Sequence, residues 1–199
     1  MNIFPVKKYL IKIIPITRRC FTKTRGTQAL LTILTLLFAA RNTAAAFDFK
    51  GIDVGGQKIS AEQVQSTLEI KCGAGSEGRI ICNGKTSIGG AAADANIVIS
   101  PKSEVTRIAL RISSRDFQKV VAAAIEKYGK PTREINSVLQ NRMGAQFPNI
   151  TYWWEGNGGN HIKISKYISS LDSGEVYFGT AEDTALLEQL FNKPKKGDI

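Results

Sequence analysis

The 199-residue sequence predicts a two-layer α+β domain, with helices packed on one face of a mainly antiparallel sheet. Two observations lead to this fold class. Short segments that alternate apolar and polar residues are joined by turn-forming residues, which is typical of antiparallel hairpins. A helix with clear end signals separates two groups of such segments, and another helix closes the chain. A parallel sheet would instead need a regular alternation of strands and helices.

The first 46 residues differ in kind from the rest and predict a signal peptide. They contain eight basic side chains and no acidic one, an apolar run at 29–40, and three alanines at 44–46 suited to a signal peptidase. The twelve-residue apolar run would rise only about 18 Å as a helix, which is short for a hydrocarbon core of roughly 30 Å. We therefore expect cleavage before Phe47, membrane contact only during export, and a periplasmic or secreted protein.

Within this segment, Thr17–Lys23 resembles the twin-arginine export motif, in which an arginine pair precedes an apolar residue and often a lysine. The resemblance implies that the protein could be exported after folding. The long gap before the apolar run is more typical of general secretion. Both routes therefore stay open, as does a translation start after Met1.

Removal of the first 46 residues changes how the charge and the cysteines are interpreted. The whole chain has a net charge of +10, but residues 47–199 hold 19 basic and 17 acidic side chains, a net charge of +2. Such a nearly neutral domain is not expected to bind nucleic acid. Cys72 and Cys82 remain as an even pair, and in an oxidising compartment they predict a disulfide that contributes on the order of 3 kcal/mol. Two free buried thiols are the alternative.

We expect residues 47–192 to form a single domain, followed by a disordered lysine-rich tail at 193–199. The glycine-spaced opening of the domain predicts a short strand and a turn. Ser60, with Gln63 three residues later, predicts a capping box for a short helix. The glycine- and alanine-rich segment 73–95 has no sustained period, so it predicts short strands and turns.

A hairpin is predicted from residues 96–100 and 106–112, which flank a Ser-Pro-Lys-Ser turn. Alternation leaves Arg107 and Arg111 to solvent and places one set of apolar side chains on a single face: Ile97, Ile99, Ile108, Leu110 and Ile112.

The clearest helix is predicted at 114–128, where apolar residues recur three and four positions apart: Phe117, Val120, Val121, Ala124, Ile125 and Tyr128. Ser113 or Ser114 can cap its first amides, and Pro131 prevents its continuation. The segment Lys127–Thr132 lies at this helix end and precedes paired aromatic strands. In this it resembles small exported, periplasmic proteobacterial proteins that have no assigned role. The resemblance implies export and carries no activity.

Beyond this helix, the polar stretch 132–149 is expected to be irregular. Residues 150–155 and 161–167 then predict a second hairpin, and 175–179 adds a third strand to form a meander. A final helix is predicted at 181–191, with several apolar side chains in its second half.

Three motif-like spacings lack the context that their chemistry needs. Gly73–Gly78 has the glycine spacing of a dinucleotide-binding loop, Gly84–Thr86 resembles the end of a P-loop, and Ala74–Gly78 is close to a serine nucleophile elbow. The first and third are not followed by a predicted helix, and the second lacks its first glycine. A metal site is not expected either, because the chain has one histidine and no free thiolate pair. We therefore expect no cofactor.

The aromatic residues of the meander are the strongest candidates for binding. If Tyr152 and Trp154 join the core, alternation sends the intervening Trp153 to the outer face. It shares that face with Lys163, Tyr167 and Tyr177, while His161 lies at the edge of the hairpin turn. The alternative is that the final helix or the N-terminal segment covers these residues and makes them a second small core.

These observations favour a non-enzymatic cell-envelope domain that binds an envelope protein or a cell-wall component through its aromatic face. The alternative is a small periplasmic hydrolase or wall-modifying enzyme without a recognisable motif, centred on His161 and a neighbouring acid. A structural or assembly subunit is a third class, which its oligomeric state would distinguish.

Overall fold

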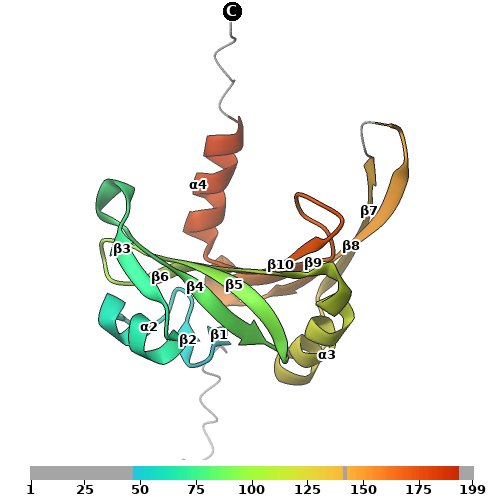
Figure 1. Ribbon diagram of the computed structural model, residues 1–199. Helices are drawn as coiled ribbons and strands as arrows, with labels where there is room; N and C mark the ends of the chain where they lie inside the picture. The colour runs from blue at the N-terminus through green and yellow to red at the C-terminus, as the bar shows by residue number, and fades with distance from the viewer. Residues whose placement is uncertain (1–46, 141–142, 193–199) are drawn as a thin grey trace, which may run out of the picture. The chain divides into compact units, whose positions relative to one another are not determined.

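A computed structural model describes residues 47–140 and 143–192, and within them a single eight-stranded antiparallel sheet dominates the fold (Figure 1). The strand order across the sheet is β3-β4-β5-β6-β10-β9-β8-β7. The strands are β3 (Lys71–Ala74), β4 (Ile80–Ile88), β5 (Ala91–Ile99), β6 (Val105–Ser113), β7 (Arg133–Gln140), β8 (Gln146–Glu155), β9 (His161–Ser165) and β10 (Ser173–Gly179). The expected antiparallel α+β class is confirmed. The predicted signal peptide and the predicted disordered tail lie outside the described residues.

The sheet consists of two halves with the same order of elements. In the first half, helix α2 (Ala61–Leu68) precedes the four strands β3 to β6. In the second, helix α3 (Phe117–Tyr128) precedes β7 to β10. The halves meet where β6 and β10 pair antiparallel over seven residues, from Arg107 with Gly179 to Ser113 with Ser173. From either edge of the sheet toward the β6–β10 seam, the four strands of a half therefore follow one another in chain order, as in a twofold arrangement. The sequence itself shows no repeat.

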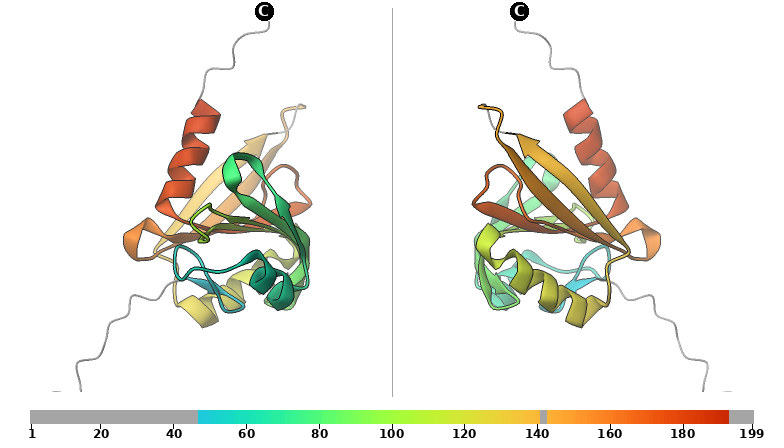
Figure 2. Two further views of the ribbon diagram at one scale, coloured as in Figure 1. Left: turned by 90° about the vertical axis from the view of Figure 1, so that its left-hand side faces the viewer. Right: turned by 90° about the vertical axis from the view of Figure 1, so that its right-hand side faces the viewer.

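One face of the sheet, here called the helical face, carries the main core. Helices α2 and α3 lie on it together with a small hairpin formed by β1 (Asp48–Phe49) and β2 (Ile52–Asp53) (Figures 1 and 2). The alternating strand residues that point to it are almost fully buried, among them Ile97, Ile108, Leu110, Ile162, Ile164 and Phe178. The predicted division of side chains between the two faces is thus confirmed for these strands.

The opposite face is concave, because both edges of the sheet rise on that side (Figures 1 and 2). Helix α4 (Ala181–Asn192) begins one residue after β10 and stands on this face, away from α2 and α3. The expectation that every helix packs on one face is therefore wrong for α4. One reason is that Thr180, the single residue between β10 and α4, caps the helix through its hydroxyl. The other is that Asp183 of the first turn pairs with Arg107, whose side chain lies on the concave face.

Two segments that were expected to be irregular or only briefly extended are regular strands. Residues 133–140 form β7 and 146–155 form β8, whereas 132–149 was expected to be irregular. The side chains of β7 are almost all exposed, so this edge strand has no alternation of apolar residues to reveal it. Strands β4 and β5 each run for nine residues. Alanines fill the first three inward positions of β5, and their apolar signal is weak.

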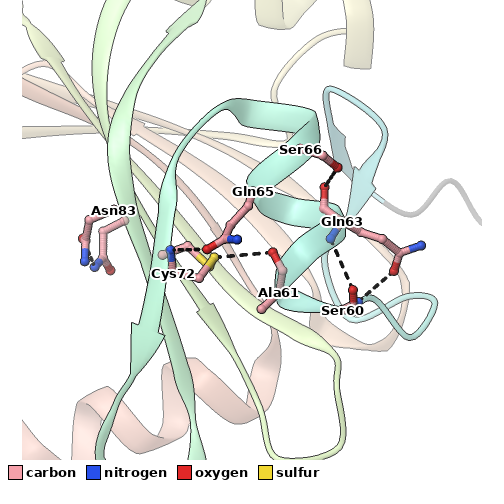
Figure 3. The surroundings of a disulfide bond; sticks show 9 residues. Ser60, Ala61, Gln63, Gln65, Ser66, Cys72 and Asn83 are labelled. Atoms are coloured by element: carbon pink, nitrogen blue, oxygen red, sulfur yellow. Dashed lines mark hydrogen bonds between the residues drawn. A yellow bond between two sulfur atoms is a disulfide. The ribbon is translucent and has the colours of Figure 1, made fainter.

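Helix α2 and strand β3 are fixed by local contacts that include the disulfide (Figure 3). Ser60 and Gln63 form both hydrogen bonds of the predicted capping box. Cys72 is bonded to Cys82 directly across the β3–β4 pair, which confirms the predicted disulfide. The Cys72 amide also donates to the Gln65 side chain at 2.9 Å, which ties the strand to the helix.

A single 3₁₀ turn at Ser114–Asp116 leads into helix α3, which ends at Tyr128 with Gly129 as its C-cap, in agreement with the predicted helix end. The Gly129 amide donates to Ile125 in the last turn, and its carbonyl accepts a 2.8 Å hydrogen bond from the indole of Trp154. Trp154 is buried in β8, so this bond fixes the end of α3 to the second half of the sheet. No helix within the described residues is long and apolar enough to cross a membrane.

Candidate binding site on the concave face

A row of seven paired side chains crosses the concave face from β4 to β7. The register of the strands places the members of this row opposite one another: Asn83, Asn96, Ala109, Tyr177, Lys163, Trp153 and Arg133. The outer-face position that the sequence predicts for Trp153, Lys163 and Tyr177 is therefore where the structure has them. Their role in binding stays a prediction.

The aromatic rings of this row form a stack with His161. The imidazole of His161 lies 4.8 Å from the Trp153 ring and 5.5 Å from the Tyr177 ring, with interplanar angles of 29° and 27°. The Arg133 guanidinium lies 4.9 Å from the Trp153 ring, and the Lys163 ammonium lies 5.3 Å from the Tyr177 ring. Trp153 thus has a cation and an imidazole as ring neighbours, and the stack forms one connected unit.

Tyr167, the remaining predicted binding residue, does not join this stack. It follows the end of β9, where its amide donates to the Asn149 side chain at 3.0 Å and its carbonyl accepts from the same amide group at 3.2 Å. Its ring contacts the Lys166 ammonium instead. The predicted cluster therefore lacks Tyr167, because β9 ends at Ser165 and the chain turns away.

The base of α4 is fixed to this face by a buried carboxylate. Asp183 is 3% exposed and accepts two hydrogen bonds from the Arg107 guanidinium, at 2.9 and 2.8 Å. The Tyr177 hydroxyl donates to the same carboxylate at 2.6 Å. Burial, and then the hydrogen bond to Asp183, raise the pKa of Tyr177, so its phenol stays protonated at neutral pH. Arg107 is therefore paired at the base of α4 and is not left to solvent as alternation alone predicts.

His161 is also largely covered by the start of α4. Its Nδ1 lies 3.3 Å from the Gly159 carbonyl oxygen, and its Nε2 lies 3.4 Å from the Thr184 hydroxyl. Since a carbonyl can only accept, the neutral ring carries its proton on Nδ1, and Nε2 is left to accept. Burial lowers the pKa of His161 below its ordinary value of 6.5, which favours the neutral ring at pH 7.

A hollow of about 390 Å³ opens between this stack and α4. Trp153, Glu155 and His161 line its sheet side, whereas its helix side is lined by Ala181, Thr184 and Ala185. The two alanine side chains end close to the helix backbone, so a slot remains between α4 and β8. At its rim, Arg133 and Glu155 form an exposed ion pair at 2.6 Å.

Sequence reasoning missed three residues that shape this site: Arg107, Arg133 and Asp183. Arg107 and Asp183 are 76 positions apart, and no local pattern connects them. Arg133 lies in β7, which carries no periodic signal. Among the described residues, no group of three or more histidine, cysteine, aspartate or glutamate side chains could hold a metal ion.

The chain matches no protein-family model, no curated protein and no solved structure.

Proposed function

We propose that the chain is an exported, non-enzymatic binding module that holds a protein partner in the slot between Trp153 and the start of α4. The observation that carries this proposal is the lining of the slot. One wall holds the rings of Trp153 and His161, with Glu155 and Asn160 beside them, and the other consists of small side chains of α4. The Glu155 carboxylate also forms an exposed ion pair with Arg133. An apolar pocket with a polar rim is the geometry in which protein interfaces place their anchor side chains.

The slot has the size to accept one or two apolar side chains of a partner. Its helix wall, α4, is fixed to the sheet by the Asp183–Arg107 pair. Binding would therefore cost little conformational entropy in this protein. The Arg133 guanidinium and the Glu155 carboxylate form an exposed ion pair beside the slot. Each could instead form an ion pair with a charged side chain of the partner.

The state of Trp153 favours a protein over a cell-wall glycan. Sugar rings bind aromatic residues through a free, flat ring face. Here the Trp153 ring stacks on His161 and also has Arg133 within cation–π distance. A side chain in the slot would instead contact Trp153 where it lines the hollow, together with the small side chains of the adjacent helix.

An extracytoplasmic location is part of the same proposal. The Cys72–Cys82 disulfide supports it, because such bonds persist in oxidising compartments. The hydrolase alternative has less support. Neither ring nitrogen of His161 is hydrogen-bonded to a carboxylate among the described residues, and its Nε2 lies 3.4 Å from the Thr184 hydroxyl.

Photo-crosslinking in living cells that express the full chain tests this proposal. A photoreactive residue replaces Ala185 in the slot, and in a control protein it replaces Ala122, which is exposed on α3. We expect a discrete protein adduct from position 185 that is absent from position 122 and is lost when Trp153→Ala is added. Identical adducts from both positions would contradict the slot as the binding site, and Trp153-dependent sedimentation with purified cell wall would show that the partner is a glycan.

A further inference from the structure

A second cavity, of about 230 Å³, lies on the helical face and is independent of the slot. It opens to solvent beside α3, the β1–β2 turn and the end of β4, and its inner end is the centre of the sheet. Its floor and walls are apolar side chains: Phe49, Ile88, Ala124, Ile162, Val176 and Phe178. Three of these, Ile162, Val176 and Phe178, are at most 1% exposed, so the cavity reaches the middle of the core.

The depth of this cavity matters because its inner end is lined by buried apolar side chains, which a bound apolar group could cover in place of water. A cavity with this lining offers a water molecule few hydrogen-bond partners. Its natural occupant would be an apolar group, and it is larger than the cavity of roughly 150 Å³ that can hold a benzene ring.

The mouth of the cavity carries two lysines, Lys50 and Lys127. Lys127 is already neutralised, because its ammonium lies 2.9 Å from the Asp48 carboxylate. Burial would raise the pKa of Asp48, but the hydrogen bonds from Lys127 and from the Gly51 amide lower it below its usual value, so this pair is ionised. The Lys50 ammonium contacts the hydroxyls of Thr86 and Ser87 at 3.0 and 3.4 Å, and it forms no ion pair with a described carboxylate.

From this combination we infer that the cavity binds a small amphiphile, with a linear apolar tail in the cavity and a carboxylate at Lys50. A single ammonium without an acidic partner suits a head group with one negative charge. The volume suits a tail of roughly eight to ten carbon atoms, somewhat more than the six of benzene. Medium-chain fatty carboxylates have this chemistry.

Isothermal titration calorimetry of the full chain with decanoate, decanol and decyltrimethylammonium tests this inference by comparing their dissociation constants. We expect decanoate to bind more tightly than decanol, and the cationic amphiphile to bind weakest. Ala124→Leu fills the cavity from α3 and should weaken decanoate binding at least tenfold. Ala122→Leu makes the same change on the exposed side of the helix and should leave binding unchanged.

The head-group contact is tested separately with Lys50→Gln, which should weaken decanoate binding several-fold and leave decanol binding unchanged. Lys102→Gln is the matched charge control, because Lys102 is exposed in a distant turn. Circular dichroism verifies that each variant is folded; should Ala124→Leu not fold, the Lys50 comparison decides. Equal affinity of wild type and folded Ala124→Leu for decanoate, equal effects of Lys50→Gln on decanoate and decanol, or no decanoate binding at all would overturn the inference.

Discussion

At the scale of single residues, Asp183 determines where α4 stands. Its carboxylate accepts hydrogen bonds from Arg107 and Tyr177, and its amide donates to the Thr180 hydroxyl that caps the helix. One side chain thus joins β6, β10 and α4 on the concave face. The ion pair is worth little as a source of net stability, but removing one member leaves an uncompensated charge in a buried position.

We therefore expect Asp183→Asn to lower the free energy of unfolding by about 3 kcal/mol, because the Arg107 guanidinium loses its buried counter-charge. Urea denaturation followed by circular dichroism measures this change. Glu182→Gln removes a neighbouring but exposed carboxylate and should change the free energy of unfolding by less than about 0.5 kcal/mol. Equal stabilities of the two variants would show that Asp183 does not fix α4.

His161 should make the free energy of unfolding depend on pH near neutrality. Its effect can be assigned without ambiguity, because it is the one histidine of the chain. Its pKa is lowered by burial, and the nearby Lys163 charge acts in the same direction, while Gly159, Asp183 and Glu155 act in the opposite one. Below pH 6.5 the unfolded chain binds a proton at this residue that the folded chain does not. The His161 contribution to stability is therefore complete above pH 6.5 and decreases as the pH falls toward the folded pKa.

Two measurements check this prediction. The imidazole resonances of His161 should titrate with a midpoint below 6.5 in an NMR experiment. His161→Phe keeps an aromatic ring between Trp153 and Tyr177 but cannot titrate. Between pH 7 and pH 5 its free energy of unfolding should fall less than that of the wild type. A midpoint above 6.5 would mean that the imidazolium is stabilised in the folded protein and that the ring is not held neutral.

At the scale of elements, the junction between α3 and β8 depends on one glycine. Gly129 has a φ of 80° and a ψ of −169°, a combination that is essentially restricted to glycine. No atom lies within 4 Å of the position where a Cβ would be. A substitution at Gly129 would therefore act through backbone strain alone. The same residue accepts the hydrogen bond from the Trp154 indole, so strain there would be transmitted to β8.

Gly129→Ala should lower the free energy of unfolding by about 1 to 3 kcal/mol, because alanine would have to adopt this strained backbone conformation. Gly73→Ala is the matched control, since Gly73 also has open space around its Cβ position but an ordinary φ. Its effect should stay within about 0.5 kcal/mol. Thermal and urea denaturation of both variants measure the difference, and similar effects of both would refute the assigned role of the backbone conformation.

At the scale of the whole molecule, the sequence predicts the elements better than their arrangement. Alternation in 106–112 and 150–155 assigns the inward side chains correctly, because each strand has one buried face and a shift by one residue would invert it. The end of α3 is predictable from Gly129 and Pro131. The edge strand β7 is not, since an exposed strand needs no apolar alternation. The side of the sheet on which α4 stands depends on a pair 76 residues apart.

The candidate slot is only partly predictable from the sequence, because one of its two sides depends on long-range contacts. Strand periodicity brings Trp153, Lys163 and Tyr177 to one face, and the register then aligns them. The helix side of the slot follows from the position of α4, which has no local signal. The cavity on the helical face is not predictable either, because it arises from small residues of α3 that face large side chains far away in sequence.

The two edges of the sheet differ in a way that predicts self-association. β3 is a short edge of four residues that the disulfide fixes to β4. β7 is longer, pairs only with β8 among the described strands, and exposes Ile135 and Val138. We expect concentrated protein to associate through β7, and Ile135→Lys to reduce this in sedimentation velocity experiments. Lys130→Glu, a charge change outside the strand, should have less effect, and unchanged association of Ile135→Lys would exclude this edge.

The seam between β6 and β10 has a further consequence for how the chain could assemble. Seven paired residues join the halves there, and each half is a complete helix-and-meander unit. If two chains exchanged their second halves, every hydrogen bond across the seam would re-form between molecules instead of within one. The fold could therefore form a domain-swapped dimer with two copies of each site. Such a dimer would reuse the boundary between the halves and would need no new interface.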